Sequence, residues 1–324
     1  MFLVAGMLLG LDIGGTQIKA ACVDESGSIA QARRVNTPAS LDQFRQALCG
    51  LLRELIPPAV TIQASGVGCK GIINPETTRV ETLPGTLHYL EGQLLSEMIA
   101  PMLPARTPIA ADNDARVALA GEITWGAARE CRNAVMLTLG TGVGGGILAD
   151  GRVIRGATGA AGHIGHLTMD PDGPLCICGN RGCLETLFSA RTIESEAFAA
   201  IHRGVDSKLA FRDSNVPPSC ADVFELARQG DTVARDIVGK ATKVLGAALA
   251  SLAFIFDPEM IILGGQISEA GDMLLDPLRQ EIGWRTRGLL RREIPIVRSK
   301  LLDPSGVLGA AALALEARRA ASAG

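Results

Sequence analysis

The sequence feature that most constrains the fold is a strand–glycine turn–strand unit that occurs twice. The first copy surrounds Asp12-Ile13-Gly14-Gly15-Thr16, and the second surrounds Gly140-Thr141-Gly142. In each copy one apolar run leads into the glycine turn and another follows it, which is the pattern of a β-hairpin. The copies stand roughly 125 residues apart in a chain of 324 residues. Repeat and length together predict two related α/β lobes.

Apolar periodicity predicts further elements between and after the two hairpins. An amphipathic helix is expected over 41–55, because the apolar residues of this segment recur on one helical face. Other strands are expected at 62–67, 109–111 and 260–263, and other helices at about 115–126, 231–256 and 305–321.

Composition and charge exclude several classes of protein. The chain has 31 Lys and Arg against 34 Asp and Glu, and a net charge of −3 favours no nucleic-acid partner. Residues 1–9 are apolar but lack the basic segment and cleavage site of a secretion signal, and they are too few to span a bilayer. We interpret them as the lead-in to a buried strand. A cytoplasmic protein without a membrane partner is expected.

His166, Cys176, Cys178 and Cys183 follow the spacing His-x9-Cys-x-Cys-x4-Cys. One imidazole and three thiolates fill the four positions of a tetrahedral Zn²⁺ and leave none open for catalysis. A cytosolic setting keeps thiols reduced, which favours metal ligation over disulfides. We therefore predict a structural zinc site. The remaining cysteines are scattered and are interpreted as small apolar residues: Cys22, Cys49, Cys69, Cys131 and Cys220.

Both glycine turns contain what a phosphate site needs. Glycines let backbone N–H groups approach phosphate oxygens, and Thr16 and Thr141 add hydroxyl donors. Asp12 can hold Mg²⁺ directly or through water, because hard cations prefer oxygen ligands. The first turn taken alone could be an ordinary hairpin turn. It is not a Walker loop, because the pattern Gly-x-x-x-x-Gly-Lys is absent there. Two matching turns indicate a nucleotide held across a cleft.

Three further positions could serve binding or catalysis. Asn113-Asp114 ends a strand and precedes a helix, so the carboxylate could accept a proton from a hydroxyl or the pair could cap the helix. Gly264-Gly265 follows a buried strand and could admit a flat ring or make a tight turn. His163 and Glu185 lie close to the metal ligands in the sequence, where they could bind the hydroxyl groups of a polyol.

These motifs together resemble the ROK family, whose members include repressors and sugar kinases of the actin/hexokinase-like (ribonuclease H-like) ATPase fold. The resemblance covers nearly the whole chain. It implies a two-lobed α/β fold with a cleft between the lobes. The smaller lobe would comprise 1–115 plus 305–324, and the larger one, with the zinc-binding loop, 116–304. It also implies ATP, Mg²⁺ and structural Zn²⁺ as cofactors, and a homodimer.

The resemblance implies a role for each matched residue. Asp114 would be the general base that activates the sugar 6-hydroxyl for attack on the γ-phosphate. The implied sugar-binding residues are Gly71, Thr82, Asn113, Asp114, His163, His166 and Glu185. The implied nucleotide-binding residues are Asp12, Gly14, Gly15, Thr16, Lys19, Gly140, Thr141, Gly142, Gly264 and Gly265. The implied metal ligands are His166, Cys176, Cys178 and Cys183.

The chain departs from the common family pattern only on the sugar side. His163 stands where most ROK sugar kinases have Glu, and the resulting Gly-His-Ile-Gly-His resembles bacterial N-acetylmannosamine kinases. Lys70 replaces a Pro, and Thr82 lies in the nearest match to the family's Asn-Leu loop. The resemblance therefore implies an ATP-dependent 6-kinase for a hexose or N-acetylhexosamine. N-Acetylmannosamine is favoured, and glucose and N-acetylglucosamine are the alternatives.

The alternative from another class is a sugar sensor that does not bind DNA, or a ROK transcriptional regulator. ROK repressors carry a helix-turn-helix segment ahead of the first phosphate turn, but only eleven residues precede Asp12 here. That length is too short for two helices, and it carries no basic cluster. Asp114 also argues against a protein that binds sugar without catalysis.

Overall fold

The computed structural model describes residues 6–211, 217–301 and 305–323, which form two compact units. Unit 1 comprises Met1–Glu130, Val153–Gly162 and Lys300–Gly324, and unit 2 comprises Cys131–Arg152 and His163–Ser299. Within the predicted lead-in, residues 1–5 lie outside the described residues.

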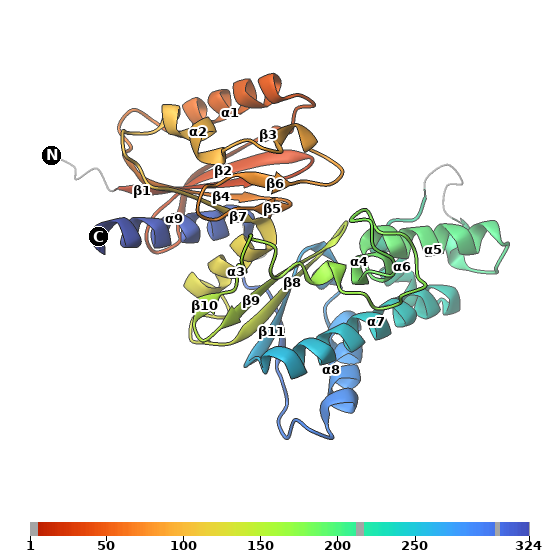
Figure 1. Cartoon of the computed structure of the whole chain (residues 1–324). Coiled ribbons are helices and arrows are strands. Elements are labelled where there is room, and N and C mark those ends of the chain that lie inside the picture. The colour runs from red at the N-terminus through yellow and green to blue at the C-terminus, as the bar shows by residue number, and fades with distance from the viewer. Residues whose placement is uncertain (1–5, 212–216, 302–304, 324) are drawn as a thin grey trace. The chain divides into compact units, whose positions relative to one another are not determined.

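Unit 1 is built on a five-stranded sheet with the order β3-β2-β1-β4-β7 (Figure 1). β1 (Met7–Ile13), β2 (Gln17–Val23) and β3 (Ile29–Asn36) are antiparallel, whereas β4 (Ile62–Cys69) and β7 (Ile109–Asn113) continue the sheet parallel to β1. The predicted first hairpin is confirmed. β3 was not predicted, because its residues are largely exposed and show no apolar run.

Helices cover both faces of the unit 1 sheet. α1 (Leu41–Leu55) has the predicted bounds and buries Phe44 and four leucines. α3 (Asp114–Thr124) and α9 (Ser305–Ala323) cover the opposite face (Figure 1). A Cβ on Gly66 of β4 would lie 1.9 Å from the carbonyl oxygen of Ala310, so the glycine lets α9 approach the sheet closely. The smaller elements are β5 (Ile72–Ile73), β6 (Val80–Thr82), η1 (His88–Leu90), α2 (Leu95–Ile99) and η2 (Ala100–Met102).

The two units differ from the predicted lobes in three places, the smallest being that the last part of unit 1 begins at Lys300 rather than at residue 305. α3 belongs to unit 1, although the predicted boundary followed residue 115. The physical reason is its packing against α9, where Gly121 and Gly309 let the two helix backbones approach each other. Val153–Gly162 also belongs to unit 1, although it follows a hairpin of unit 2. Neither segment shows an apolar face that would identify its partner in the sequence.

Unit 2 repeats the strand arrangement of unit 1, with the order β10-β9-β8-β11-β12. β8 (Ala134–Leu139) and β9 (Val143–Ala149) form the predicted second hairpin, which β10 (Arg152–Val153) extends. β11 (Met260–Gly264) runs parallel to β8, and β12 (Ile296–Arg298) runs parallel to β11. The repeat predicted from the glycine turns is therefore confirmed as a repeat of sheet topology.

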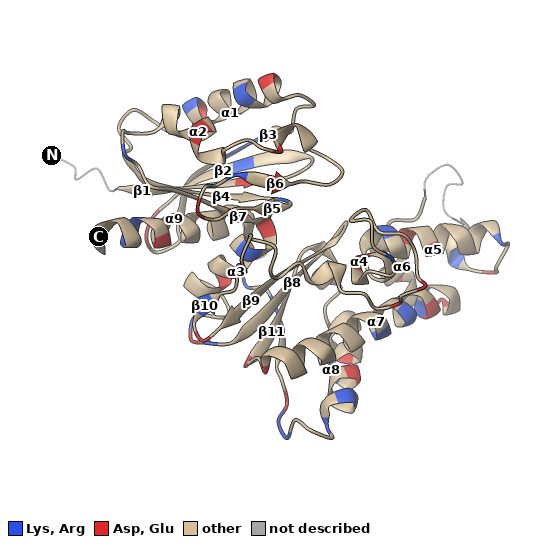
Figure 2. Ribbon diagram, in the orientation of Figure 1, with Lys and Arg blue, Asp and Glu red and all other residues tan. Residues whose placement is uncertain are grey.

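The helices of unit 2 surround a long central helix, α7 (Thr232–Phe256). Among the described residues, α7 is the one helix long and apolar enough to cross a membrane, but 61% of its most apolar window is buried, as expected for a core helix. Figure 2 shows both signs of charge on α7 and α8. The other helices are η3 (Ile164–His166), α4 (Leu184–Leu187), α5 (Ala190–His202), η4 (Lys208–Phe211), α6 (Cys220–Arg228), η5 (Gln266–Ala270) and α8 (Asp272–Thr286).

Candidate active site

Two carboxylates gather at one edge of the unit 1 sheet. The strand register aligns Asp12 of β1 with Gly68 of β4, and Gly68 with Asp112 of β7. Asp114 follows two residues later, at the start of α3. Burial, and after it the charge of Asp114, raises the pKa of Asp12 from 3.8 to about 6, while Lys19 acts in the opposite direction. The two carboxylates are therefore close enough to repel each other.

Asn113 orients the start of α3. Its side-chain oxygen accepts the N–H of Ala115 at 3.0 Å, and its side-chain Nδ2 donates to the carbonyl oxygen of Gly71 at 3.0 Å. Asn113 is therefore the N-cap, and Asp114 is the first helical residue, with one carboxylate oxygen 2.9 Å from the N–H of Ala115. The sequence left the two roles open, and the structure assigns the cap to Asn113.

The predicted sugar-loop residues of unit 1 lie beside this cap. Gly71 has a φ of 92°, and a Cβ there would lie 2.3 Å from the carbonyl oxygen of Thr82. Gly71, Thr82 and Asn113 are thus neighbours, and only glycine fits the first position without strain. Lys70, the departure from the family pattern, is exposed.

Neighbouring segments hold the first glycine turn. The N–H of Gly14 donates to the carbonyl oxygen of Gln17 at 3.0 Å, and the Thr37 hydroxyl donates to the carbonyl oxygen of Gly14 at 2.7 Å. Gly15 and Thr16 are exposed at the tip. Lys19 lies opposite Asp12 on β2. A Cβ on Gly306 would lie 2.4 Å from Oδ2 of Asp12, so this carboxylate lies against the first turn of α9.

Unit 2 brings the second glycine turn together with Gly264-Gly265. The N–H of Gly140 donates to the carbonyl oxygen of Gly142 at 3.0 Å. Gly265 has a φ of 79°, and a Cβ there would lie 2.4 Å from the carbonyl oxygen of Leu139. The two glycine motifs therefore touch, although more than a hundred residues separate them in the sequence.

A pocket of about 650 Å³ lies near both motifs in unit 2. It is lined by residues of α5, α6 and η5, among them Glu194, Phe224 and Ile267. Ala190, one of its lining residues, donates its N–H to the carbonyl oxygen of Gly140 at 2.9 Å, and η5 follows Gly265 directly. No sequence motif marks this pocket, because its walls come from three segments that share no motif.

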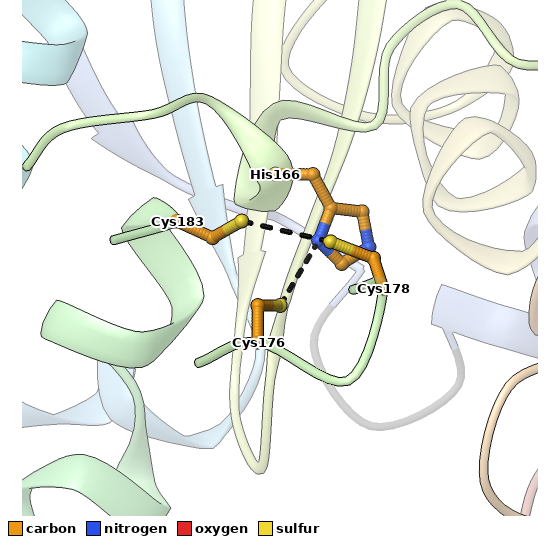
Figure 3. A group of neighbouring side chains, drawn as sticks. All are labelled: His166, Cys176, Cys178 and Cys183. Atoms are coloured by element: carbon orange, nitrogen blue, oxygen red, sulfur yellow. Dashed lines mark hydrogen bonds between the residues drawn. The ribbon is translucent and has the colours of Figure 1, made fainter. Parts of the chain in front are cut away.

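The four predicted metal ligands converge in unit 2 (Figure 3). All four ligand atoms lie within 4.8 Å of one another. The Sγ atoms of Cys178 and Cys183 are 3.7 Å apart, and Sγ of Cys176 is 3.6 Å from Nδ1 of His166. A tetrahedral Zn²⁺ with usual bond lengths requires about 3.8 Å between two sulfurs and about 3.5 Å between sulfur and nitrogen. The cluster therefore fits Zn²⁺ in both donor chemistry and spacing.

Glu185 and His163 connect the metal cluster to its surroundings within unit 2. Oε2 of Glu185 accepts the N–H of Val143 at 2.9 Å, immediately after the second glycine turn. A Cβ on Gly142 would lie 2.2 Å from the same oxygen. The rings of His163 and His166 are nearly parallel, with an interplanar angle of 11° and centroids 6.3 Å apart. Glu185 therefore links the segment that carries the metal ligands to the second glycine turn.

The predicted site residues fall into one group in each unit. The unit 1 group consists of Asp12, Gly14, Gly15, Thr16, Lys19, Gly71, Thr82, Asn113 and Asp114. The unit 2 group consists of Gly140, Thr141, Gly142, His163, His166, Cys176, Cys178, Cys183, Glu185, Gly264 and Gly265. Within each group, residues that are distant in sequence become neighbours.

Comparison with known proteins places these features in a family. The model of the ROK family matches residues 8–317. A glucokinase of Streptomyces coelicolor is 35% identical over 96% of this chain and 98% of its own length, and an N-acetylmannosamine kinase of Salmonella typhi is 32% identical over 94% and 97%. The crystal structure of a ROK family glucokinase from Streptomyces griseus in complex with glucose and AMPPNP superimposes with a TM-score of 0.82 at 32% identity, covering 96% of this chain and all of that one.

Proposed function

Because the chain belongs to the ROK family and is an ATP-dependent sugar kinase, we propose that it phosphorylates the 6-hydroxyl of an N-acetylhexosamine, with N-acetylmannosamine as the first choice. The observation that carries the proposal is Asp114. Its carboxylate stands at the start of α3, and the Asn113 cap orients that helix end. Asp12 lies at the same sheet edge.

Asp114 acts as the general base in this proposal. It accepts the proton of the sugar 6-hydroxyl as that oxygen bonds to the γ-phosphorus. The bond from the γ-phosphorus to the bridging oxygen of ADP breaks, and ADP leaves. Asn113 contributes through its side-chain amide, whose bond to Gly71 links the base to the proposed sugar loop. Such positioning carries much of the catalysis of phosphoryl transfer.

Each unit offers its own group of residues to the nucleotide. The turns at Gly14–Thr16 and Gly140–Gly142 offer backbone N–H groups and threonine hydroxyls to the phosphates. Gly264 and Gly265, with the pocket beside them, accept the adenosine. Asp12 would hold Mg²⁺ directly or through water, and this ion supplies positive charge to the phosphate oxygens. A cation there would also offset the repulsion between Asp12 and Asp114.

The metal cluster braces the sugar-binding surface. Four protein ligands leave no open position, so the proposed Zn²⁺ is structural. His166 presents Nδ1 to the cluster, which leaves Nε2 as the nitrogen that can meet a sugar hydroxyl. Glu185 lies two residues after the last ligand and contacts the second glycine turn. Loss of the metal would therefore affect both sugar and phosphate binding.

His163 supports the choice of sugar. Overall sequence identity does not discriminate between glucose and N-acetylmannosamine as the substrate, because the glucokinase and the N-acetylmannosamine kinase relatives are 35% and 32% identical to this chain. The motif around His163 resembles that of the N-acetylmannosamine kinases. A neutral imidazole offers one donor and one acceptor, whereas the family's usual glutamate only accepts, so the two favour different substituents on the sugar. Glucose and N-acetylglucosamine remain the alternatives.

A panel of sugars in a coupled ADP assay tests the proposal. We expect kcat/KM to be highest for N-acetylmannosamine, and His163→Glu to shift the preference toward glucose. Lys240→Gln, at an exposed position of α7 outside the proposed site residues, is the control. Equal or better turnover of glucose by the wild-type enzyme would remove the N-acetylmannosamine assignment.

We also propose that the protein is a homodimer of the cytoplasm, without a nucleic-acid or membrane partner. The family resemblance supports the dimer, and the net charge of −3 supports the absence of a nucleic-acid partner.

A further inference from the structure

The residue before the Asn113-Asp114 pair is a buried carboxylate with two cationic partners. Oδ1 of Asp112 lies 2.7 Å from Nε and 2.6 Å from Nη2 of Arg116, while Oδ2 accepts from Nε of Arg155 at 2.8 Å. The exposed fractions of the three side chains are 2% for Asp112, 0% for Arg116 and 26% for Arg155. The two arginines therefore bind different oxygens of one carboxylate.

Both arginines also hold the segment 155–161 on unit 1. Arg155 lies at its beginning, and Nη1 of Arg116 donates to the carbonyl oxygen of Ala161 at its end, at 2.6 Å. The N–H of Ala161 donates to the carbonyl oxygen of Arg155 at 3.2 Å, which closes the segment into a loop. Gly159 lies against β5, because a Cβ there would be 2.2 Å from the carbonyl oxygen of Ile73.

This loop lies between two parts of the proposed site along the chain. Unit 1 contains the segment through Gly162, and the next residue is His163, which begins the stretch that carries His166 and the metal cluster. At its other side the loop is bound to Asp112, whose neighbours in sequence are Asn113 and Asp114. The Asp112–Arg155 ion pair thus connects the strand that precedes the proposed base to the chain that leads into the proposed sugar-binding residues His163 and His166.

We propose that Arg155 is a positioning residue for the sugar. Its ion pair with Asp112 holds the 155–161 loop and thereby fixes the position of the chain that leads into His163 and His166. The inference rests on the proposed function of those histidines. Loss of Arg155 leaves the buried Asp112–Arg116 pair and the Arg116–Ala161 hydrogen bond intact, so Asp114 keeps its place while the beginning of the loop loses its attachment. The effect should therefore appear in sugar binding rather than in the chemical step.

Hydrogen–deuterium exchange and steady-state kinetics of Arg155→Gln test this proposal together. We expect faster amide exchange in 156–162, a sugar KM raised about tenfold, and kcat and the KM for ATP nearly unchanged, because the substitution removes the charge-assisted hydrogen bond to Asp112 and a longer, exposed ion pair with Glu316 at 3.6 Å. Arg155→Lys should restore part of the sugar affinity. Arg318→Gln is the matched control, because Arg318 is 22% exposed and pairs with Glu25 at 2.8 Å elsewhere on unit 1.

The outcomes are distinct. Unchanged exchange in Arg155→Gln would show that the ion pair does not hold the loop, and would overturn the proposal. Faster exchange with an unchanged sugar KM, or with equal losses for sugar and ATP, would also overturn it, because the loop would then be structural only. If the wild-type enzyme phosphorylated no sugar of the panel, the proposed function would fail. The exchange comparison would still show whether the Asp112–Arg155 ion pair holds the 155–161 loop.

Discussion

At the scale of single residues, Asp12 is a carboxylate in a position that makes the folded protein less stable when it is charged. It is a carboxylate that burial and the neighbouring Asp114 disfavour in its charged form. An apolar or amide side chain would be more stable there. The charge is therefore best explained by a cation that binds it, which is the proposed Mg²⁺ of the nucleotide.

The pH dependence of stability tests this view of Asp12. Its pKa in the folded protein is about 6 against an ordinary 3.8, so between these values the folded chain holds a proton that the unfolded chain releases. That stabilising contribution is present below 3.8 and is lost as the pH rises through 6. We expect Asp12→Asn to melt at a higher temperature than wild type near neutral pH without Mg²⁺, with a difference that shrinks on acidification. A difference independent of pH, measured by scanning fluorimetry, would contradict the assignment.

Asp114 should separate catalysis from binding. Asp114→Asn keeps the size of the side chain but removes the base, so kcat should fall by about 10² to 10⁴. Sugar affinity, measured by calorimetry, should remain close to that of wild type. Asp236→Asn is the control, because Asp236 is exposed and pairs only with Lys240 of its own helix turn among the ion pairs of the described residues. Turnover like that of wild type in Asp114→Asn would reject the general-base role.

At the scale of elements, the metal-binding loop has little regular structure of its own. Between η3 and α4 it contains two isolated β-bridges, Thr168 with Cys183 and Leu175 with Arg181. Leu175 and Ile177 are exposed large apolar residues, so the loop does not bury an apolar core. A metal ion would replace that core, as it does in other small metal-braced segments.

Cys178→Ser tests the metal without disturbing the core. Cys178 is exposed, whereas Cys176 and Cys183 are buried, so the substitution removes a ligand but little packing. We expect a lower melting temperature, faster proteolysis of the loop and reduced kinase activity, and the same from chelation of the wild-type protein. Cys49→Ser, in α1, should change none of these. Full activity in protein shown by metal analysis to be zinc-free would refute the structural role.

At the scale of the whole molecule, each unit has the same strand order and its own helices. The repeat gives each unit a glycine turn at the equivalent hairpin, which is where the two proposed phosphate contacts lie. Charge of both signs is mixed over the outer helices (Figure 2), and the net charge is −3. In the part of the chain that the structure describes, this mixture of charges supports the proposal that the protein has no nucleic-acid partner.

A direct binding assay distinguishes the kinase from a regulator of the same family. We expect no binding of a fluorescent DNA duplex at low salt, where non-specific electrostatic attraction is strongest. A cationic DNA-binding protein at the same concentration serves as the positive control. Salt-sensitive binding of the duplex, with or without sugar, would favour the regulator.

Local sequence sufficed where the signal is local. The helix at 41–55 has the predicted bounds, because its apolar face repeats every turn. Both hairpins were predicted from apolar runs on either side of a glycine turn, and the four metal ligands from their spacing. In each case the residues that decide the structure lie within a short stretch of chain.

Only the tertiary structure showed which of these stretches are neighbours. It placed α3 in unit 1 through packing against α9, brought Gly265 onto Leu139, and joined Arg155 to Asp112. The spacing of Asp112 and Arg116 suits an i,i+4 pair, but nothing in the sequence marks Arg155 as the second partner. Periodicity and spacing record backbone geometry over a few turns or strands. Contacts between distant segments depend on how the whole chain packs, and within each unit that packing made distant residues of the proposed site neighbours.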